Sequence, residues 1–169
     1  MFECALIIIL SFTLDLLLGD PVYRYHPVRI IGNSIAFFEG ILFRWKQNTL
    51  LGGVILTLII VILFPLIYVL IFLFLETNLS VYVSYIFSIY IVYSCISLKD
   101  LLKHANKVVS ELNYSLDRGR KAVQMIVGRN AELLDKEGII KATVECIAES
   151  FVDGILAPAF WFVAGGFIG

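Results

Sequence analysis

Charged residues are scarce in this sequence of 169 residues, and cysteine is rarer still. Asp, Glu, Lys and Arg together make up 16% of the chain, against about 25% in soluble domains, whereas apolar residues reach 60%. The formal net charge of −1 gives no basic surface for nucleic acid, and the hydrophobicity excludes an intrinsically disordered chain. A soluble domain of this length has too small an interior for so much apolar surface. The composition therefore predicts an integral membrane protein.

Several chemical motifs are absent as well. Cys4, Cys95 and Cys146 lie in different segments and form no C-x-x-C pair, so neither a disulfide framework nor a zinc site is indicated. The two histidines, His26 and His104, belong to no Ser-His-Asp set and no zinc cluster. The chain also lacks the G-x-x-x-x-G-K-[ST] motif, which excludes a P-loop nucleotide fold. These absences argue against hydrolytic and zinc chemistry.

Two long uncharged runs, and a first run that is apolar except for Glu3 and Asp15, predict three membrane-spanning helices within residues 1–98. About 20 apolar residues suffice to cross the hydrocarbon core, and each run approaches or exceeds that length. Only a few polar residues around Glu76 separate the last two runs, so we expect an antiparallel hairpin with a kink at Pro65. Residues 154–169 are uncharged and apolar but short, so we expect them to form either a re-entrant segment or a span cut off by the end of the sequence. The expected spans are residues 2–18, 52–75 and 79–98.

Lysine and arginine are distributed unevenly around these spans. The loop between Gly19 and Thr49 carries four of them and residues 99–153 carry nine, whereas the turn at Glu76 carries none. Because cytoplasmic loops are enriched in Lys and Arg, both basic segments are expected in the cytoplasm. The sequence thus predicts an all-α, polytopic protein of the cell membrane, in which residues 99–153 form an amphipathic cytoplasmic helical segment.

One face of this cytoplasmic segment is acidic. Asp135 is expected to cap a helix on which Glu145, Glu149 and Asp153 recur at four-residue intervals and so share a face. Like charges at this spacing repel one another, so a compensating positive charge is expected. Either solvent with Lys141 and its basic neighbours provides it, or a Mg²⁺ ion does, because Mg²⁺ prefers carboxylate oxygens and substrate phosphates.

A second polar group flanks the first apolar segment. Asp15 lies within an apolar helix, where an acid is either functional or reaches out to the membrane interface. Beyond Asp20, His26 and Arg29 are three residues apart on what we interpret as the first helical turn after Pro27. Such a turn presents two donors to an anion at the membrane surface. The alternative is an ordinary turn with an interfacial arginine.

A third polar group is basic and comprises Arg118, Arg120 and Lys121 together with Gly128-Arg129-Asn130. Glycine beside arginine lets backbone amides and a guanidinium approach one phosphate. A basic patch beside a membrane segment is more often a contact for lipid head groups. The sequence leaves both interpretations open.

Taken together, these motifs resemble the CbiB/CobD family of cobalamin biosynthesis. The resemblance covers nearly the whole chain and corresponds to the N-terminal portion of a family whose members are roughly twice as long. Asn130-Ala131 stands where the family pattern reads Asp-Thr, and Ser150-Phe151 where it reads Asn-Thr. The matching strings are LDLLLGDP at 14–21, HPVRIIG at 26–32, MIVGR at 125–129, ATVECIAE at 142–149 and DGILAP at 153–158.

The resemblance implies an adenosylcobinamide-phosphate synthase, or its N-terminal half. Such an ATP-dependent amide ligase joins adenosylcobyric acid to aminopropanol or aminopropanol phosphate and needs Mg²⁺. We expect the lipid bilayer, and either a second chain or a homo-oligomer that supplies the C-terminal half, as further partners, and no nucleic acid. On this basis Glu145, Glu149 and Asp153 are expected near the metal and Arg29, Arg129 and Asp20 at the substrates. His26, Glu145 and Glu149 are the expected catalytic residues, with His26 orienting a substrate or moving a proton.

Two other functions remain open from the sequence. One is a non-catalytic, AmpE-like membrane sensor or scaffold whose cytoplasmic helices bind partner proteins. The other is a part of a transporter, in which Asp15 and the kink at Pro65 belong to a translocation pathway. Binding of Mg²⁺-ATP or of cobyric acid distinguishes the ligase from both.

Overall fold

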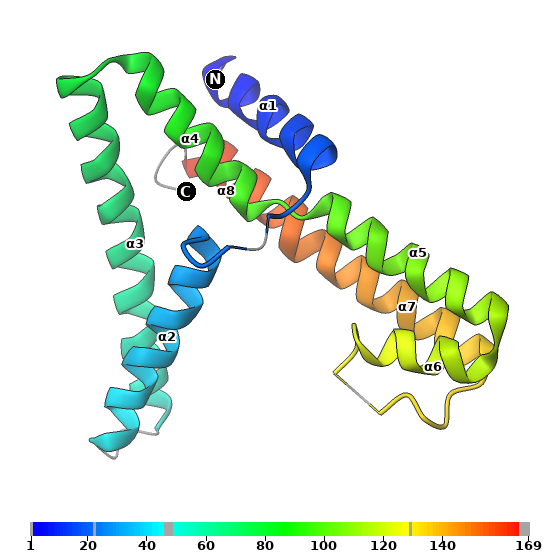
Figure 1. Ribbon diagram of the computed structural model, residues 1–169. Coiled ribbons are helices and arrows are strands. Elements are labelled where there is room, and N and C mark those ends of the chain that lie inside the picture. Colours follow the sequence, from blue (N-terminus) through cyan, green and yellow to red (C-terminus); the bar gives the residue numbers. More distant parts are fainter. Residues whose placement is uncertain (1, 22, 46–48, 129, 166–169) are drawn as a thin grey trace.

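The computed structural model describes residues 2–21, 23–45, 49–128 and 130–165 and is all-α throughout these ranges (Figure 1). The expected fold class is therefore confirmed. The helices are α1 (Phe2–Leu18), α2 (Pro27–Arg44), α3 (Leu50–Asn78), α4 (Val81–Cys95), α5 (Leu98–Tyr114), α6 (Leu116–Gln124), α7 (Lys136–Phe151), the π-helix η1 (Val152–Leu156) and α8 (Ala157–Gly165).

Three described helical stretches are long and apolar enough to cross a membrane. They are α3, the stretch from Val81 to Tyr114 that contains α4 and α5, and the stretch from Lys136 to Gly165 that contains α7, η1 and α8. Helix α1 coincides with the expected segment 2–18 and has 17 residues. The expected span 52–75 lies inside α3, and Pro65 is inside that helix without ending it. The structure is thus that of a membrane protein.

Helix starts follow local sequence signals. The Asp135 carboxylate accepts a hydrogen bond from the Gly138 N–H at 2.8 Å, so the expected N-cap of α7 is confirmed. Thr49, Ser80 and Ser115 cap α3, α4 and α6 in the same way. Pro27 occupies the first turn of α2, where its missing N–H costs nothing.

The segment between Gly19 and Thr49, named as a loop between spans, contains α2, because the helical turn expected after Pro27 continues as far as Arg44. The basic residues of this segment suggested a loop, but α2 is mostly apolar and no residue of it is buried. An exposed apolar helix is stable where lipid or another protein surface replaces water. Helix α2 is thus an exposed helix that packs beside α3, and it is not among the described stretches long and apolar enough to cross a membrane.

The helices form two arms that meet near the middle of the molecule (Figure 1). Helices α2 and α3 lie side by side in one arm, and α5, α6 and α7 form a three-helix bundle in the other. Helices α1, α4 and α8 pack together at the junction around Ile7, Val92, Ile96 and Phe162. The bundle has its own core, built on Val108, Val123 and Ile139.

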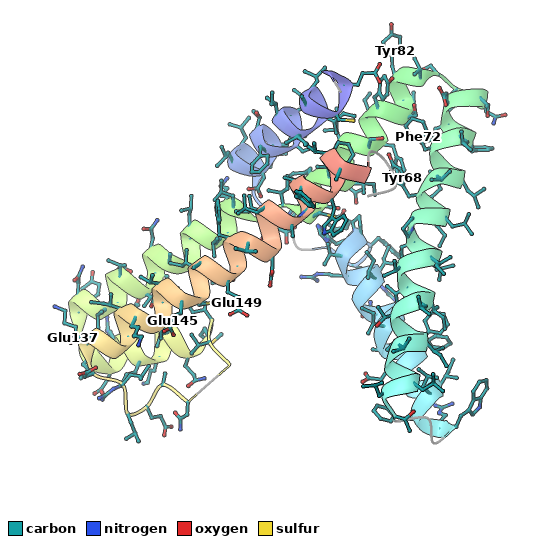
Figure 2. The ribbon with its side chains drawn as sticks, turned by 180° about the vertical axis from the view of Figure 1, so that it is seen from behind. Tyr68, Phe72, Tyr82, Glu137, Glu145 and Glu149 are labelled. Atoms are coloured by element: carbon teal, nitrogen blue, oxygen red, sulfur yellow. The ribbon has the colours of Figure 1, made fainter. Side chains whose placement is uncertain are left out.

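Polar contacts hold the apolar helices in register. The Ser11 hydroxyl of α1 donates to the Ile89 carbonyl of α4 at 3.0 Å. Tyr68 of α3 shares a hydrogen bond of 2.7 Å with Ser88 of α4 and stacks on Phe87. Figure 2 shows Tyr68 and Phe72 directed from α3 toward α4. These contacts tie α4 to both α1 and α3.

Candidate functional site

A cavity of about 680 Å³ opens where three helical paths are interrupted. The first interruption is the link between α1 and α2, and the second is the two-residue break at Ile96 and Ser97 between α4 and α5. The third is η1, a π-helix between α7 and α8, a feature often associated with functional sites. The lining residues are Asp20, His26, Val28, Arg29, Ser94, Cys95, Ser97, Glu149, Ser150, Asp153 and Gly154.

His26 and Asp20 form the buried side of this cavity. His26 is buried, and its Nε2 lies 2.9 Å from Oδ1 of the half-buried Asp20. The ring of Tyr23 meets the imidazole edge to face at 5.4 Å, so the ring is held from a second direction. The contact is one of charge and distance and not a hydrogen bond, since the buried Nε2 has no hydrogen-bond partner among the described residues.

Arg29 lies one helical turn after His26. His26 is the residue that precedes the first turn of α2, without a capping hydrogen bond from its side chain, and Arg29 lies in that turn after Pro27, as expected. The Arg29 side chain is exposed and lines the cavity. A helix N-terminus also provides unpaired N–H groups and the positive end of the helix dipole. This turn therefore presents positive potential to a phosphate or carboxylate in the cavity.

The turn before Asp20 is fixed by contacts from α4 and α5. Gly19 has φ of +75°, and its carbonyl accepts a hydrogen bond from the Tyr93 hydroxyl. Lys99 crosses this turn closely, since a Cβ added at Gly19 would lie 3.1 Å from the Lys99 Cδ. The Lys99 Nζ donates to the Leu17 carbonyl at 2.6 Å. These contacts set the position of Asp20 relative to α5.

Asp15 does not reach out to the membrane interface. Its side chain is fully buried, and its Oδ2 accepts a hydrogen bond from the Lys99 N–H at 3.0 Å. Ser97, the N-cap of α5, makes no such bond with its own side chain. Asp15 thus provides the cap of α5 from another helix. It is a positioning residue that does not line the cavity.

Glu149 and Asp153 form the acidic side of the cavity, and both are exposed to it. Gly154 lets η1 approach the break after α4, because a Cβ there would lie 3.1 Å from the Ser97 Oγ. Glu145 lies one turn earlier on α7, outside the cavity lining, with an oxygen 4.0 Å from the Lys141 Nζ. Figure 2 shows Glu149 nearer the meeting point of the helices than Glu145.

The structure thus brings five of the expected site residues to one cavity: Asp20, His26, Arg29, Glu149 and Asp153. It does not bring Glu145 there. Arg129 lies outside the described residues, and its neighbours Gly128 and Asn130 line a different cavity of about 840 Å³ beside α6. Arg120 and Lys121 also line this second cavity and not the one at the helix junction.

Carboxylates are the metal ligands that this cavity offers. Within the described ranges, no three His, Cys, Asp or Glu side chains gather closely enough to hold a metal ion by themselves. Mg²⁺ usually keeps several waters and binds through one or two carboxylates together with substrate phosphates. Glu149 and Asp153, two carboxylates on one cavity wall, suit that type of coordination, whereas a dedicated three-carboxylate cage is not formed.

Sequence reasoning missed the small polar residues of this cavity, Ser94, Ser97 and Ser150. Ser97 was detectable in principle, because it directly precedes the amphipathic pattern of α5 and such residues are preferred at helix starts. Ser94 and Ser150 lie inside helices, and no local signal distinguishes them from other helical serines.

A known protein family matches nearly the whole of this sequence. The sequence model of the family described as CobD/Cbib protein matches residues 8–169. The chain belongs to this family. The expected resemblance is therefore confirmed, and it includes the strings that contribute the cavity residues.

Individual relatives agree with this assignment. The cobalamin biosynthesis protein CobD of Clostridium perfringens is 35% identical over 94% of this chain and 51% of its own length. The cobalamin biosynthesis protein CobD of Desulfotalea psychrophila is 36% identical over 93% of this chain and 48% of its own length. The probable cobalamin biosynthesis protein CobD of Archaeoglobus fulgidus is 33% identical over 96% of this chain and 52% of its own length. The chain spans about half the length of the curated relatives it matches. No solved structure matches it.

Proposed function

We propose that the chain is the N-terminal half of an ATP-dependent amide ligase of cobalamin biosynthesis. The reaction joins a carboxyl group of adenosylcobyric acid to aminopropanol or its O-phosphate. The observation that carries the proposal is that family motifs from two segments, more than a hundred residues apart, converge on one cavity. Asp20, His26 and Arg29 come from the motifs within residues 14–32, and Glu149 and Asp153 from those within residues 142–158.

The chemistry requires activation of a carboxylate, because a carboxylate is a poor electrophile. Transfer of a phosphoryl group from ATP gives an acyl phosphate; the amine nitrogen then forms the C–N bond, and phosphate leaves with the C–O electron pair. Bound Mg²⁺ would neutralise charge on the phosphates, and Glu149 and Asp153 are the residues that would hold it. Arg29 binds the transferred phosphoryl group or the substrate carboxylate, and His26, oriented by Asp20, accepts the proton that the amine releases.

We further propose that the protein is a multi-pass protein of the cell membrane with its basic segments in the cytoplasm, where ATP is available. Because the chain spans half the length of its relatives, the other half is supplied by a second chain or by further sequence. The corrinoid, a large substrate, would then bind between the two halves.

The test is binding of Mg²⁺-ATP and of cobyric acid to the detergent-solubilised protein. We expect Glu149→Ala to raise the dissociation constant of Mg²⁺-ATP about tenfold, since loss of one charged ligand is commonly worth that much. Glu145→Ala is the matched comparison on the same helix, and we expect a smaller effect because Glu145 lies outside the cavity lining. The same measurements are repeated with the C-terminal half of a relative co-expressed. If neither Mg²⁺-ATP nor cobyric acid binds in either case, the ligase is rejected in favour of a scaffold.

A further inference from the structure

An apolar groove separates α3 from α8. Helices α3 and α4 diverge from the turn that joins them, and α8 lies on the α4 side (Figure 1). The groove has a volume of about 1020 Å³, at the upper limit of the roughly 300–1,000 Å³ typical of small-molecule pockets, and every residue that lines it is uncharged. A groove of this size and composition suits an apolar segment and not a polar ligand. Its walls include Val61, Pro65 and Leu66 of α3 and Trp161, Ala164 and Gly165 of α8.

Pro65 removes one backbone hydrogen bond from the α3 wall. Proline has no N–H, so the Val61 carbonyl lacks the donor that the fourth residue along an α-helix normally provides. An unpaired carbonyl is costly in hydrocarbon, and lipid tails contain no donor. In transmembrane helices, Ser and Thr side chains and neighbouring helices pair such carbonyls again. The α3 wall therefore favours a neighbouring helix with a hydroxyl group over a lipid chain.

The α8 wall leaves room for the backbone of such a helix. Ala164 and Gly165 are its small residues, and a Cβ added at Gly165 would meet nothing within 4 Å in the described part of the chain. Small residues let two helix backbones approach closely inside a membrane. Trp161, which is exposed on the same wall, adds a large apolar surface for the neighbour to cover. Both walls thus match the requirements of helix packing in a membrane.

Family sequence outside this chain points to the occupant of the groove. The chain spans about half the length of its curated relatives, and on the proposed function it is the N-terminal half. The other half then begins after residue 169, close in sequence to Gly165. A second copy of this chain fits less well, because a two-fold contact would set the same hollow against itself.

We propose that an apolar helix of the C-terminal half packs into the groove between α3 and α8 and pairs the Val61 carbonyl through a Ser or Thr hydroxyl. The inference rests on the proposed assignment to the N-terminal half, but it does not depend on ATP or on the reaction. The groove is then an interface inside the membrane, and it shares none of its described lining residues with the cavity that contains His26 and Glu149.

The first experiment places a photo-reactive benzoylphenylalanine at position 61 in the groove wall. The chain is co-expressed in membranes with the separately tagged C-terminal half of the Clostridium perfringens relative. We expect irradiation to link the two tagged chains covalently, at a peptide that mass spectrometry assigns to an apolar run of the C-terminal half. Leu70 is the matched control, because it is also exposed but lies two and a half turns after Val61, on the opposite face of α3. The same replacement at Leu70 should lose this product.

The second experiment fills the groove from the α8 wall. Gly165→Leu places a large side chain in open space, so the chain itself is expected to keep its helical circular dichroism. We expect the amount of co-purified C-terminal half to fall about tenfold, because an overpacked contact loses that much affinity. Gly53→Leu is the matched control, since Gly53 also has open space around it but lies in α3 outside the groove.

Three results overturn the inference. The first is a product at position 61 that contains only lipid or a second copy of this chain. The second is full co-purification of the C-terminal half with Gly165→Leu, and the third is absence of association between the wild-type halves. Binding of Mg²⁺-ATP and of cobyric acid, measured on the same samples, tests the ligase separately. A chain that associates through the groove but binds neither ligand keeps the interface and rejects the ligase.

Discussion

The carboxylate of Asp15 accepts a hydrogen bond from the backbone N–H of Lys99 at 3.0 Å, across 84 positions of sequence. The Lys99 ammonium in turn donates to the Leu17 carbonyl at 2.6 Å. This reciprocal pair ties the end of α1 to the start of α5. Because Asp20 and His26 follow α1 directly, the same pair sets where they stand relative to the rest of the cavity.

Replacement of Asp15 by alanine should destabilise the protein. The substitution removes a fully buried acceptor and leaves the Lys99 N–H without a partner, which costs about 1–3 kcal/mol of unfolding free energy. Asp15→Asn retains an acceptor oxygen, so we expect a smaller loss. Thr13→Ala, an exposed position on the same helix, should stay within about 0.5 kcal/mol of wild type. Denaturant unfolding in detergent, followed by circular dichroism, measures all three; equal stability of Asp15→Ala and wild type would contradict the role of this cap.

Two glycines should respond in opposite directions to substitution by alanine. Gly19 has φ of +75° and contacts the Lys99 side chain, so Gly19→Ala should cost about 1–2 kcal/mol in backbone strain alone. Gly32 lies inside α2 with open space around it, and Gly32→Ala should stabilise the helix by about 0.5–1 kcal/mol. The melting temperatures in one detergent give the signs, and a stabilising Gly19→Ala would show that the turn is not constrained.

Features with a local cause could be predicted from the sequence. The cap at Asp135 and the helix start at Pro27 depend on a few neighbouring residues, and both were recognised. Ser97 has a local signal, as a residue favoured at helix starts, but nothing local shows that a cavity opens there, and the π-helix at 152–156 has no local signal at all.

The acidic residues of α7 and η1 also show that a local sequence pattern does not locate a cavity. A four-residue repeat identifies the face that Glu145, Glu149 and Asp153 share, but not the point along the helix where a cavity opens. That point depends on where α1 ends and α5 begins, which is a tertiary property. The repeat therefore predicted two cavity residues and one residue outside the cavity.

Gly154 and Ser97 should be coupled in binding of Mg²⁺-ATP. A methyl group at position 154 would lie 3.1 Å from the Ser97 hydroxyl, so Gly154→Ala forces a shift of a few tenths of an ångström at the cavity wall. We expect weaker nucleotide binding in Gly154→Ala and a partial recovery in the double variant with Ser97→Ala, where the obstructing hydroxyl is absent. A double-mutant cycle on the dissociation constants measures the coupling, and strictly additive effects would show that the close approach is irrelevant to the site.

The orientation in the membrane predicts which cysteines a membrane-impermeant thiol reagent reaches. In a background with the native cysteines at 4, 95 and 146 replaced by serine, Asn78→Cys lies at the α3–α4 turn and Glu132→Cys lies between α6 and α7. Basic segments stay in the cytoplasm, and Glu132 lies within the segment that carries nine Lys and Arg residues, whereas the α3–α4 turn carries none. We therefore expect intact cells to label Asn78→Cys at once and Glu132→Cys only after permeabilisation. The reverse pattern would place Asp20, His26 and Glu149 on the side without ATP, and a ligase that consumes ATP would then be incompatible with this topology.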